Sequence, residues 1–261
     1  PRPLRLCYAG QVLRAHGDQI QPERQLGQAG AELIGSAAAT ADVEVVRLAL
    51  ESLSGIGIVG ITVDLNMPTL ISALVTDLEL DKASAEGLRE ALDRKDVDAV
   101  AAAGDEVARV VVPLLDVVGP VEEALPAMEK LVLPAAAAGE RDSFLQTTRL
   151  IAEELSNVRL TVDPVETRGF EYHCGVTFTL FARSEREELG WGGRYLVDDA
   201  DGGKDNAESA TGFTLFMGAI MGALPRPQTP NRVYLPLGTP PAAAAGLCGE
   251  GWVVVGGLEE V

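Results

Sequence analysis

The chain has 261 residues, a formal net charge of −18 and a hydrophobic content of 47%. This length suits one large domain, or one domain with a fragment of another, and no apolar run is long enough to span a membrane. The acidic charge disfavours a phosphate backbone as the main ligand. Three widely separated cysteines exclude a disulfide scaffold and favour a cytoplasmic location, in a reducing compartment.

The N-terminal part predicts two strands, over residues 4–14 and 24–35. In the second strand Gln28, Gly30 and Glu32 share one face, with Gln28 and Glu32 about 13 Å apart along the strand. Because Gly30 places no side chain between them, an amino-acid-sized ligand would fit in this gap. The alternative is that both polar residues face water and that Gly30 marks a bulge.

The middle of the chain predicts mainly helices. A helix is expected over residues 40–53, capped by Thr40 or Asp42, and a second one begins at Pro68 after a strand over residues 58–65. From about residue 81 to residue 155 the pattern is almost entirely helical and indicates an insertion. Its candidate helices cover residues 84–93, 96–103, 105–118, 121–132 and 141–155.

A strand predicted over residues 168–182 has two unlike faces. Alternation places Glu171, His173, Gly175 and Thr177 on one face, which resembles the floor of a polar pocket. An ordinary half-solvated strand would give the same alternation. The other face is expected to be apolar and to carry Phe170, Tyr172, Cys174, Val176 and Phe178.

The C-terminal part predicts further strands over residues 159–163 and 192–197, then a strand and a helix over 210–224. The polar segment 197–209 is expected to be a loop, and its acidic residues lack EF-hand spacing, so no metal site is expected. A strand–helix–strand pattern follows residue 230. It is too small to fold alone, so we expect it to dock on the main domain or to belong to a longer segment.

These segments, in this order, resemble class II histidyl-tRNA synthetases. Residues 5–14 and 24–35 look like the motif 2 hairpin of that family. Arg168-Gly-Phe-Glu-Tyr172 and Gly192-Gly-Arg-Tyr195 look like its histidine-specific signature, and Ala210-Thr-Gly-Phe-Thr-Leu looks like the start of motif 3.

The resemblance implies an α+β fold, with a class II aminoacyl-tRNA synthetase-like antiparallel sheet flanked by helices. The synthetase-like core would cover residues 1–226, with the helical insertion at about 81–155 and a partial C-terminal α/β segment at 227–261. Motif 1, a dimer-interface element of the family, would precede Pro1.

The resemblance also implies a histidine site. Gln28 and Glu32 would bind the amino group and the imidazole of the ligand, and Arg168 would face its carboxylate. His173 stands where the family usually has a tyrosine, which changes the shape of that wall. The implied histidine-binding residues are Gln28, Glu32, Arg168, Tyr172, His173 and Tyr195.

The ATP site of the family is not retained. Its motif 2 carries Arg-x-Glu, whereas this chain has Arg14-Ala-His16, so that Arg14 is a vestige. Ala219 occupies the position of the motif 3 arginine, and an alanine cannot donate hydrogen bonds to a triphosphate. We therefore expect no amino-acid activation and no cofactor.

A retained histidine site beside a lost ATP site resembles the family of ATP phosphoribosyltransferase regulatory subunits. The resemblance implies a non-catalytic subunit in the first step of histidine biosynthesis. It would activate the short catalytic subunit, mediate feedback inhibition by histidine and self-associate as a dimer, with neither membrane nor tRNA as a partner. Two alternatives remain: an active histidyl-tRNA synthetase, and a synthetase-like protein that binds another small metabolite.

Overall fold

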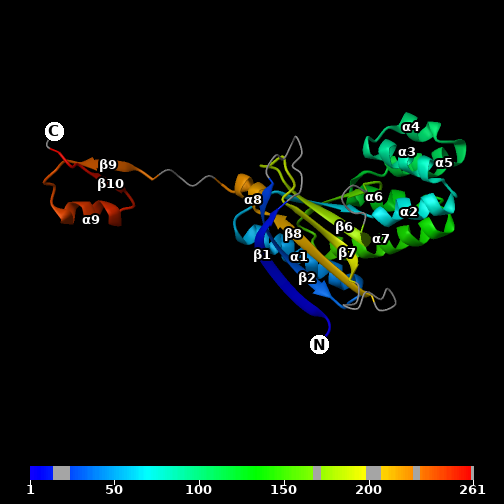
Figure 1. Cartoon of the computed structure of the whole chain (residues 1–261), viewed down its shortest axis with the longest axis horizontal. Coiled ribbons are helices and arrows are strands. Elements are labelled where there is room, and N and C mark those ends of the chain that lie inside the picture. The colour runs from blue at the N-terminus through cyan, green and yellow to red at the C-terminus, as the bar shows by residue number, and fades with distance from the viewer. Residues whose placement is uncertain (14–23, 167–171, 198–206, 226–229, 260–261) are drawn as a thin grey trace. The chain divides into compact units, whose positions relative to one another are not determined.

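The computed structural model describes residues 1–13, 24–166, 172–197, 207–225 and 230–259 (Figure 1). The chain divides into two compact units, Pro1–Leu224 and Pro225–Val261. Within the described residues, no helix has both the length and the apolar character needed to cross a membrane.

The larger unit alternates strands and helices along the chain. In order it contains β1 (Leu4–Leu13), β2 (Gln25–Ile34), α1 (Ala39–Gly55), β3 (Ile61–Asn66), α2 (Pro68–Asp77), α3 (Lys82–Asp93), α4 (Val97–Ala102), α5 (Asp105–Leu115), β4 (Gly119–Pro120), α6 (Val121–Glu129), α7 (Ala135–Glu154), β5 (Arg159–Asp163), β6 (His173–Ala182), β7 (Gly190–Val197), β8 (Glu208–Phe216) and α8 (Met217–Ala223).

The strands of this unit form one eight-stranded sheet in the order β1-β2-β8-β7-β6-β3-β5-β4. All neighbouring strands are antiparallel except β3 and β5, which are parallel. The predicted α+β class with a mainly antiparallel sheet is therefore confirmed. The hairpin of β1 and β2 lies at one edge, and the helical insertion follows β3 and α2 near the other.

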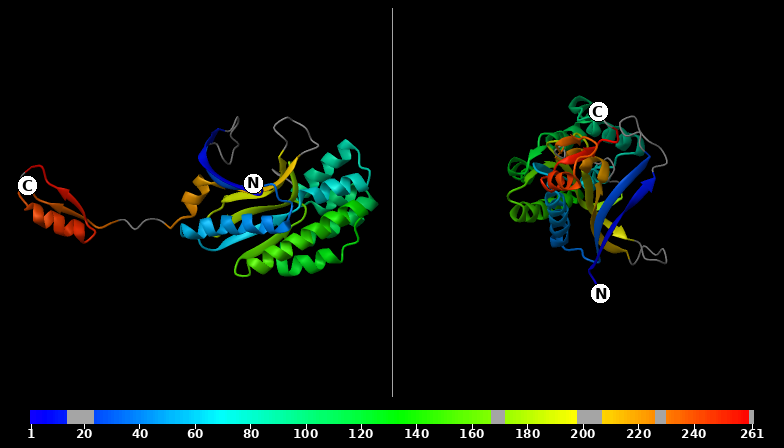
Figure 2. Two further views of the ribbon diagram at one scale, coloured as in Figure 1. Left: turned by 90° about the horizontal axis from the view of Figure 1, so that it is seen from below. Right: turned by 90° about the vertical axis from the view of Figure 1, so that its left-hand side faces the viewer.

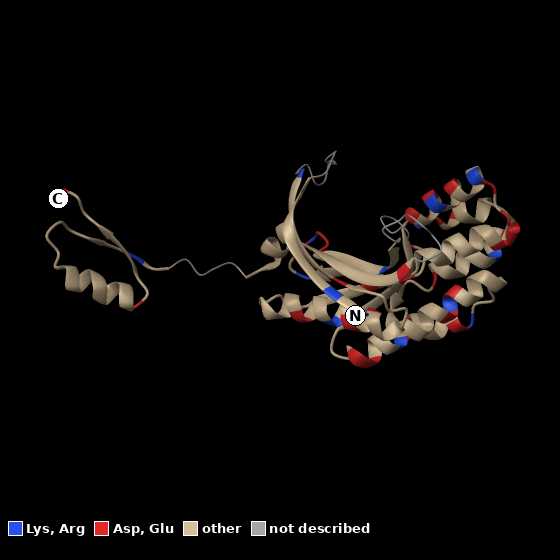
Figure 3. Ribbon diagram, turned by 60° about the horizontal axis from the view of Figure 1, so that its bottom comes forward, with Lys and Arg blue, Asp and Glu red and all other residues tan. Residues whose placement is uncertain are grey.

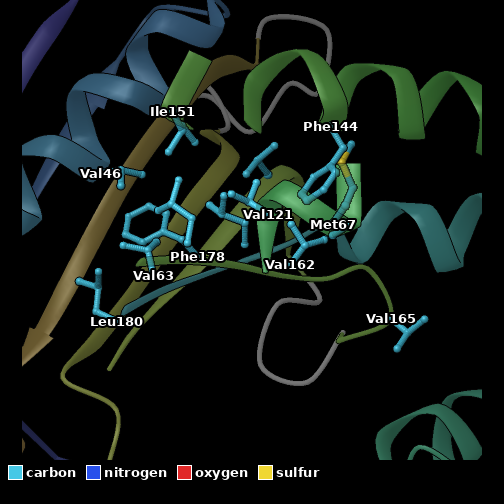
Figure 4. Close-up of a cluster of buried hydrophobic side chains, with 14 of the residues drawn as sticks. Val46, Val63, Met67, Val121, Phe144, Ile151, Val162, Val165, Phe178 and Leu180 are labelled. Atoms are coloured by element: carbon cyan, nitrogen blue, oxygen red, sulfur yellow. The ribbon is translucent and has the colours of Figure 1, made fainter. Parts of the chain in front are cut away.

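Helices cover one face of the sheet (Figure 2). Helix α1 lies against β2, β7 and β8, while α2 and α7 lie against β6. Figure 4 shows Val46 of α1 and Ile151 of α7 beside Phe178 and Val63 of the strands. We call this side the helix-covered face; its buried strand residues include Leu33, Val63, Leu65, Phe178, Leu180, Phe213 and Leu215.

The opposite side of the same strands carries polar and small residues, because successive side chains of a strand alternate between faces. We call it the polar face. Its members include Glu32, Asp64, Thr177, Thr179, Trp191, Gly193, Tyr195, Gly212 and Thr214, which pair across the strands in register. This difference between the two faces positions the candidate site.

The segment predicted to be helical contains helices α3 to α7, with the two-residue strand β4 between α5 and α6, and one predicted boundary is wrong. Helix α7 begins at Ala135, immediately after its N-cap Pro134, and therefore starts before the predicted helix over residues 141–155, with Gly139 inside it. The run of alanines from 135 to 138 explains the difference, because alanine has the highest helix propensity and outweighs one glycine.

The cap of α1 is a second correction. Ala38 is the N-cap and no side chain caps the helix, so neither Thr40 nor Asp42 has the predicted role. Asp42 instead lies in the first turn, buried, and forms an ion pair with Arg194 of β7.

The smaller unit contains β9 (Arg232–Leu235), α9 (Pro241–Gly249) and β10 (Val253–Gly256). The two strands are parallel, with Val254 opposite Val233. No residue of α9 is buried. By itself, the described part of this unit therefore has no buried hydrophobic core.

Candidate functional site

The floor of the candidate site consists of two glycines on neighbouring strands. Gly193 of β7 pairs with Gly212 of β8, and the same row continues to Thr177 on one side and Glu32 on the other. Directly opposed residues of an antiparallel pair share a face, so this row leaves a gap between Thr177 and Glu32.

Both floor positions require glycine. A Cβ at Gly212 would lie 1.7 Å from Oε2 of Glu32, and one at Gly193 would lie 2.6 Å from Cγ2 of Thr177. Such distances are far inside van der Waals contact, so a larger residue would displace the side chains beside it. The absence of side chains at these two paired positions thus leaves space over the sheet into which the Glu32 carboxylate and the Thr177 side chain extend.

A cavity of about 260 Å³ lies above this floor. Its volume is sufficient for a small molecule of amino-acid size. The residues that line it are Glu32, Tyr172, His173, Trp191, Gly192, Gly193, Tyr195, Gly212, Phe213 and Thr214.

Among the described residues that line this cavity, Glu32 supplies the one carboxylate. In Figure 3 the sheet is largely tan and the charged segments are concentrated on the helices, and Glu32 is the only charged residue of β2. Its Oε2 accepts a hydrogen bond of 2.7 Å from the hydroxyl of Tyr195. Partial burial raises the pKa of Glu32, and the bond from Tyr195 opposes that shift.

The second oxygen of Glu32 is the group that a ligand can use. No hydrogen bond from the described residues reaches its Oε1. A carboxylate that is partly buried, and that has one oxygen already bonded to a phenol, favours a positively charged or N–H-bearing partner at the other oxygen.

Aromatic rings form a wall of the cavity. The ring centroids of Tyr172 and His173 are 4.0 Å apart, those of Tyr172 and Tyr195 6.1 Å, and those of His173 and Trp191 6.0 Å. Burial, with a contribution from Glu32, raises the pKa of Tyr172 to about 12, so its phenol is neutral at physiological pH. Neutral aromatic faces attract planar or cationic groups.

Arg194, whose side chain lies on the helix-covered face, connects the floor strand β7 to the start of α1. Its guanidinium bonds Asp42 Oδ2 at 2.8 Å, the carbonyl oxygens of Ser36 and Ala38 at 2.8 and 2.9 Å, and Ser209 Oγ at 2.5 Å. Burial raises the pKa of Asp42, and the charge of Arg194 opposes this shift. The start of α1 is thereby attached to the strand that carries Gly193 and Tyr195.

The structure brings together four of the predicted histidine-binding residues. Glu32, Tyr172, His173 and Tyr195 all line this cavity. Gln28 is not among the lining residues; it pairs with Phe216, further along β8. Arg168 and Arg14 lie outside the described residues.

The gap predicted over Gly30 is wrong, because Tyr8 fills it. Tyr8 of β1 pairs directly with Gly30, and the Tyr8 hydroxyl oxygen lies 2.6 Å from the position a Gly30 Cβ would take. The ring reaches across the glycine to Thr214, where the two hydroxyl oxygens are hydrogen-bonded at 2.5 Å. The cavity lies over Gly193 and Gly212 instead.

The predicted division of β6 into faces is partly wrong. His173 and Thr177 lie on the polar face as expected, but Tyr172 precedes the strand and lines the same cavity as His173. A register shift between His173 and Thr177 breaks the simple alternation. Gly175, expected as the gap in the polar face, lies against the side chain of Arg194, as a Cβ there would be 3.0 Å from Arg194 Cδ.

Trp191, Thr214 and the paired floor glycines were not predicted as site residues. The sequence holds a weak signal for them, since glycines occur at 192, 193 and 212 within strand patterns. Only the register between β7 and β8 shows that two of these glycines are opposite each other. Among the described residues, no group of three or more His, Cys, Asp or Glu could hold a metal ion.

Comparison with known proteins places the chain in a family. The family model described as histidyl-tRNA synthetase matches residues 1–220. A curated protein of Paramagnetospirillum magneticum, named ATP phosphoribosyltransferase regulatory subunit, is 49% identical over 259 residues, which are 99% of this chain and 66% of that protein. The chain thus spans about two thirds of the length of this curated relative.

Two solved structures share the fold. One is an ATP phosphoribosyltransferase regulatory subunit/histidyl-tRNA synthetase from Bacillus halodurans, with a TM-score of 0.72 and 22% identity, covering 100% of this chain and 70% of that one. The other is an ATP phosphoribosyl transferase complex from Thermotoga maritima, with a TM-score of 0.64 and 19% identity, covering 83% and 74%. The predicted class II synthetase-like fold is confirmed. The chain therefore belongs to the histidyl-tRNA synthetase family, and it groups there with proteins named ATP phosphoribosyltransferase regulatory subunit.

Proposed function

We propose that this chain is the synthetase-like part of a regulatory subunit of ATP phosphoribosyltransferase, and that its cavity binds histidine. The subunit would not be catalytic. It would activate the short catalytic subunit and transmit feedback inhibition by histidine. The names of its relatives support the regulatory assignment, and the cavity above Gly193 and Gly212 supports a ligand of amino-acid size.

The observation that carries the choice of ligand is the Glu32–Tyr195 pair facing the aromatic wall. A histidine side chain offers a planar ring with N–H donors and a pKa near neutrality, about 6.5. Its ring would stack against Tyr172 and His173 while one N–H donates to Oε1 of Glu32. Arg168 as the contact for the ligand carboxylate, and Gln28 as the contact for its amino group, remain predictions.

The composition of α8 supports a non-catalytic role. Its sequence, MGAIMGA, contains no basic residue, and Ala219 is buried together with Ile220 and Ala223 in the hydrophobic core. An alanine packed in the core cannot bind a phosphate group. Motif 3 of this chain therefore contributes no charge to the binding of a triphosphate.

The partner we propose is the short catalytic subunit of ATP phosphoribosyltransferase. The Thermotoga maritima structure of the same fold is described as such a complex, which supports the assignment without specifying the contact surface. Self-association, a cytoplasmic location and the lack of tRNA binding are further parts of the proposal, as is the assignment of residues 227–261 to a partial C-terminal segment.

Calorimetric titration of histidine tests the proposal, first with the chain alone and then with its complex with the catalytic subunit. If histidine binding is coupled to the partner, the affinity for histidine of the chain alone must differ from that of the complex. The expected difference in binding free energy is about 1–3 kcal/mol. Glu32→Gln, which keeps the shape of the side chain and removes its charge, serves as the control for the site. Equal affinities in both states, or no binding in either, would contradict the sensor role.

ATP–pyrophosphate exchange driven by histidine separates this proposal from the active-synthetase alternative. We expect none above background, because α8 lacks a group for phosphate. Robust exchange would favour the synthetase. A thermal-shift comparison of histidine with other small metabolites tests the remaining alternative, which gains support if another compound raises the unfolding temperature more than histidine does.

A further inference from the structure

Thr214 of β8 brings a hydroxyl group to the wall of the cavity, next to the carboxylate of Glu32. Both side chains lie on the polar face, because Glu32 pairs with Gly212 and Thr214 follows Gly212 by two residues. Oε2 of Glu32 lies 1.7 Å from the position that a Gly212 Cβ would take. The carboxylate and the hydroxyl are therefore neighbours along β8, about 7 Å apart by the rise of the strand.

Tyr8 of the edge strand β1 holds the Thr214 hydroxyl in place. Tyr8 pairs with Gly30, and Gly30 pairs with Thr214, so the three residues form one row across the strands. Because Gly30 has no side chain, the Tyr8 ring passes over it, and the Tyr8 hydroxyl oxygen lies 2.5 Å from Oγ1 of Thr214. This bond holds Thr214 in the rotamer that turns Oγ1 toward β2, the strand that carries Glu32.

The hydroxyl of Thr214 retains hydrogen-bonding capacity. A hydroxyl group offers one hydrogen and two lone pairs. The bond to Tyr8 uses one of the three, and no second hydrogen bond from the described residues reaches Oγ1. Whichever oxygen donates in that bond, at least one lone pair of Thr214 remains for a ligand. Thr214 Oγ1 and Glu32 Oε1 are thus two acceptors on the same side of the cavity.

The charge of Glu32 determines which end of an amino acid is favoured beside Thr214. The described residues that line the cavity include no lysine or arginine, and Glu32 supplies their one carboxylate. A position beside a partly buried carboxylate favours a cation and disfavours a second carboxylate. The ammonium end of a free amino acid is therefore favoured next to Thr214, with its carboxylate directed away from Glu32.

We propose that Thr214 is a ligand-binding residue of this site: its hydroxyl, held by Tyr8, accepts a hydrogen bond from the amino group of histidine while the imidazole bonds Glu32. This rests on the proposed function, since it assigns a contact within the same site. Two carbon atoms separate the ring of histidine from its amino nitrogen, so one ligand can reach both acceptors. Gln28 lies two residues beyond Gly30 on β2 and does not line the cavity.

The test compares three ligands by calorimetry on the full chain, directly or in competition with histidine. They are histidine, histamine, which lacks the carboxylate, and imidazolepropionate, which lacks the amino group. Thr214→Val keeps the shape of the side chain and removes its hydroxyl. It should weaken the binding of histidine and histamine about 10- to 100-fold, as expected for a hydrogen bond to a charged group, and leave that of imidazolepropionate unchanged.

Three further variants sharpen the comparison. Thr214→Ser keeps the hydroxyl and should retain most of the affinity for all three ligands. Tyr8→Phe removes only the group that positions Thr214, so its loss should be smaller, about three- to tenfold, and confined to the two ligands with an amino group. Thr179→Val is the matched control, because Thr179 lies in the same row of the polar face and does not line the cavity. It should bind all three ligands as the unaltered chain does.

The outcomes distinguish this inference from the function beneath it. A lack of histidine binding by the unaltered chain would overturn both. Histidine binding that Thr214→Val leaves unchanged, or an equal loss of all three ligands in that variant, would overturn only the role of Thr214. Where Thr214→Val folds poorly, Tyr8→Phe provides the same comparison, and equal losses of the three ligands there would likewise contradict the proposal.

Discussion

Arg194 and Tyr195 are neighbours in β7, yet their side chains leave the strand on opposite faces and meet different surroundings. Arg194, on the helix-covered face, uses Nε and both terminal nitrogens to bond Asp42, Ser209 and two carbonyl oxygens of the segment before α1. Tyr195, on the polar face, makes one hydrogen bond, to Glu32, at the edge of a cavity.

This contrast distinguishes two kinds of polar group. Arg194 represents groups that stabilise the fold, and the Tyr195–Glu32 pair represents groups that a ligand can reach. A buried polar group whose bonding capacity is used up stabilises the fold and has nothing to offer a small molecule. A partly buried carboxylate with one oxygen outside its internal hydrogen bond can accept a further bond from a ligand. Substitutions on the two faces should therefore change different measured quantities.

The largest effect on stability is expected from Arg194→Leu. It leaves the buried Asp42 without its partner, which should lower the free energy of unfolding by roughly 3 kcal/mol in a denaturant titration. The double variant Arg194→Leu/Asp42→Leu should recover part of this loss, since no charge then remains buried. A double variant as unstable as the sum of the single changes would mean that the ion pair is not the cause.

Gly212→Ala should act mainly on binding. Its Cβ would lie 1.7 Å from the Glu32 carboxylate, so Glu32 must move and histidine affinity should fall by about two orders of magnitude, with a loss of stability of about 1–3 kcal/mol. Gly218→Ala in α8 is the matched control, because no atom lies within 4 Å of its Cβ position. That control should bind histidine normally, and a similar loss in both variants would refute the role of the floor.

Removing the charge at Glu32 should weaken binding without unfolding the protein. Charged hydrogen bonds contribute about 1.5–3 kcal/mol, so Glu32→Gln should lower histidine affinity by roughly 10- to 100-fold. Gln28→Ala should have a smaller effect, because Gln28 is not among the residues that line the cavity. Calorimetry on the two variants checks this order, and equal losses would argue against Glu32 as the principal contact.

The smallest effect is a pH dependence of stability without ligand. Burial raises the pKa of Glu32 above its ordinary value, so the folded chain binds this proton more tightly than the unfolded chain. The stabilisation from Glu32 is therefore complete below the ordinary carboxyl pKa and is lost as the pH rises through the raised pKa. Glu32→Gln should remove this contribution, which appears as the difference between the two unfolding curves across that pH range. Parallel curves would show that the raised pKa has no effect on stability.

Local patterns in the sequence were sufficient to predict most elements of the fold. The hairpin, α1, α2 and the helical insertion follow from hydrophobic periodicity, proline position and alanine content. The errors have physical causes. The start of α7 was misplaced because a single glycine did not end a strong alanine helix, and the cap of α1 was wrong because Asp42 is bound to Arg194, 152 residues away.

The candidate site was predictable in its residues but not in its geometry. Resemblance to a family identified Glu32, Tyr172, His173 and Tyr195, which do line one cavity. The floor depends on the pairing of β7 with β8, and the filling of the Gly30 gap depends on the pairing of β1 with β2. Registers of this kind are set by contacts across the whole sheet, so one strand read alone cannot show them.

The order of three consecutive residues in β7 has a mechanical consequence. Gly193 forms the floor, Arg194 holds the start of α1, and Tyr195 bonds Glu32. One planar peptide unit joins the anchor of the helix to the phenol in the cavity, so covalent geometry rather than packing sets their spacing. A shift of α1 would therefore move the Arg194 side chain that is bonded to it. The backbone of β7 would carry this movement to Tyr195, whose hydroxyl lies 2.7 Å from Glu32.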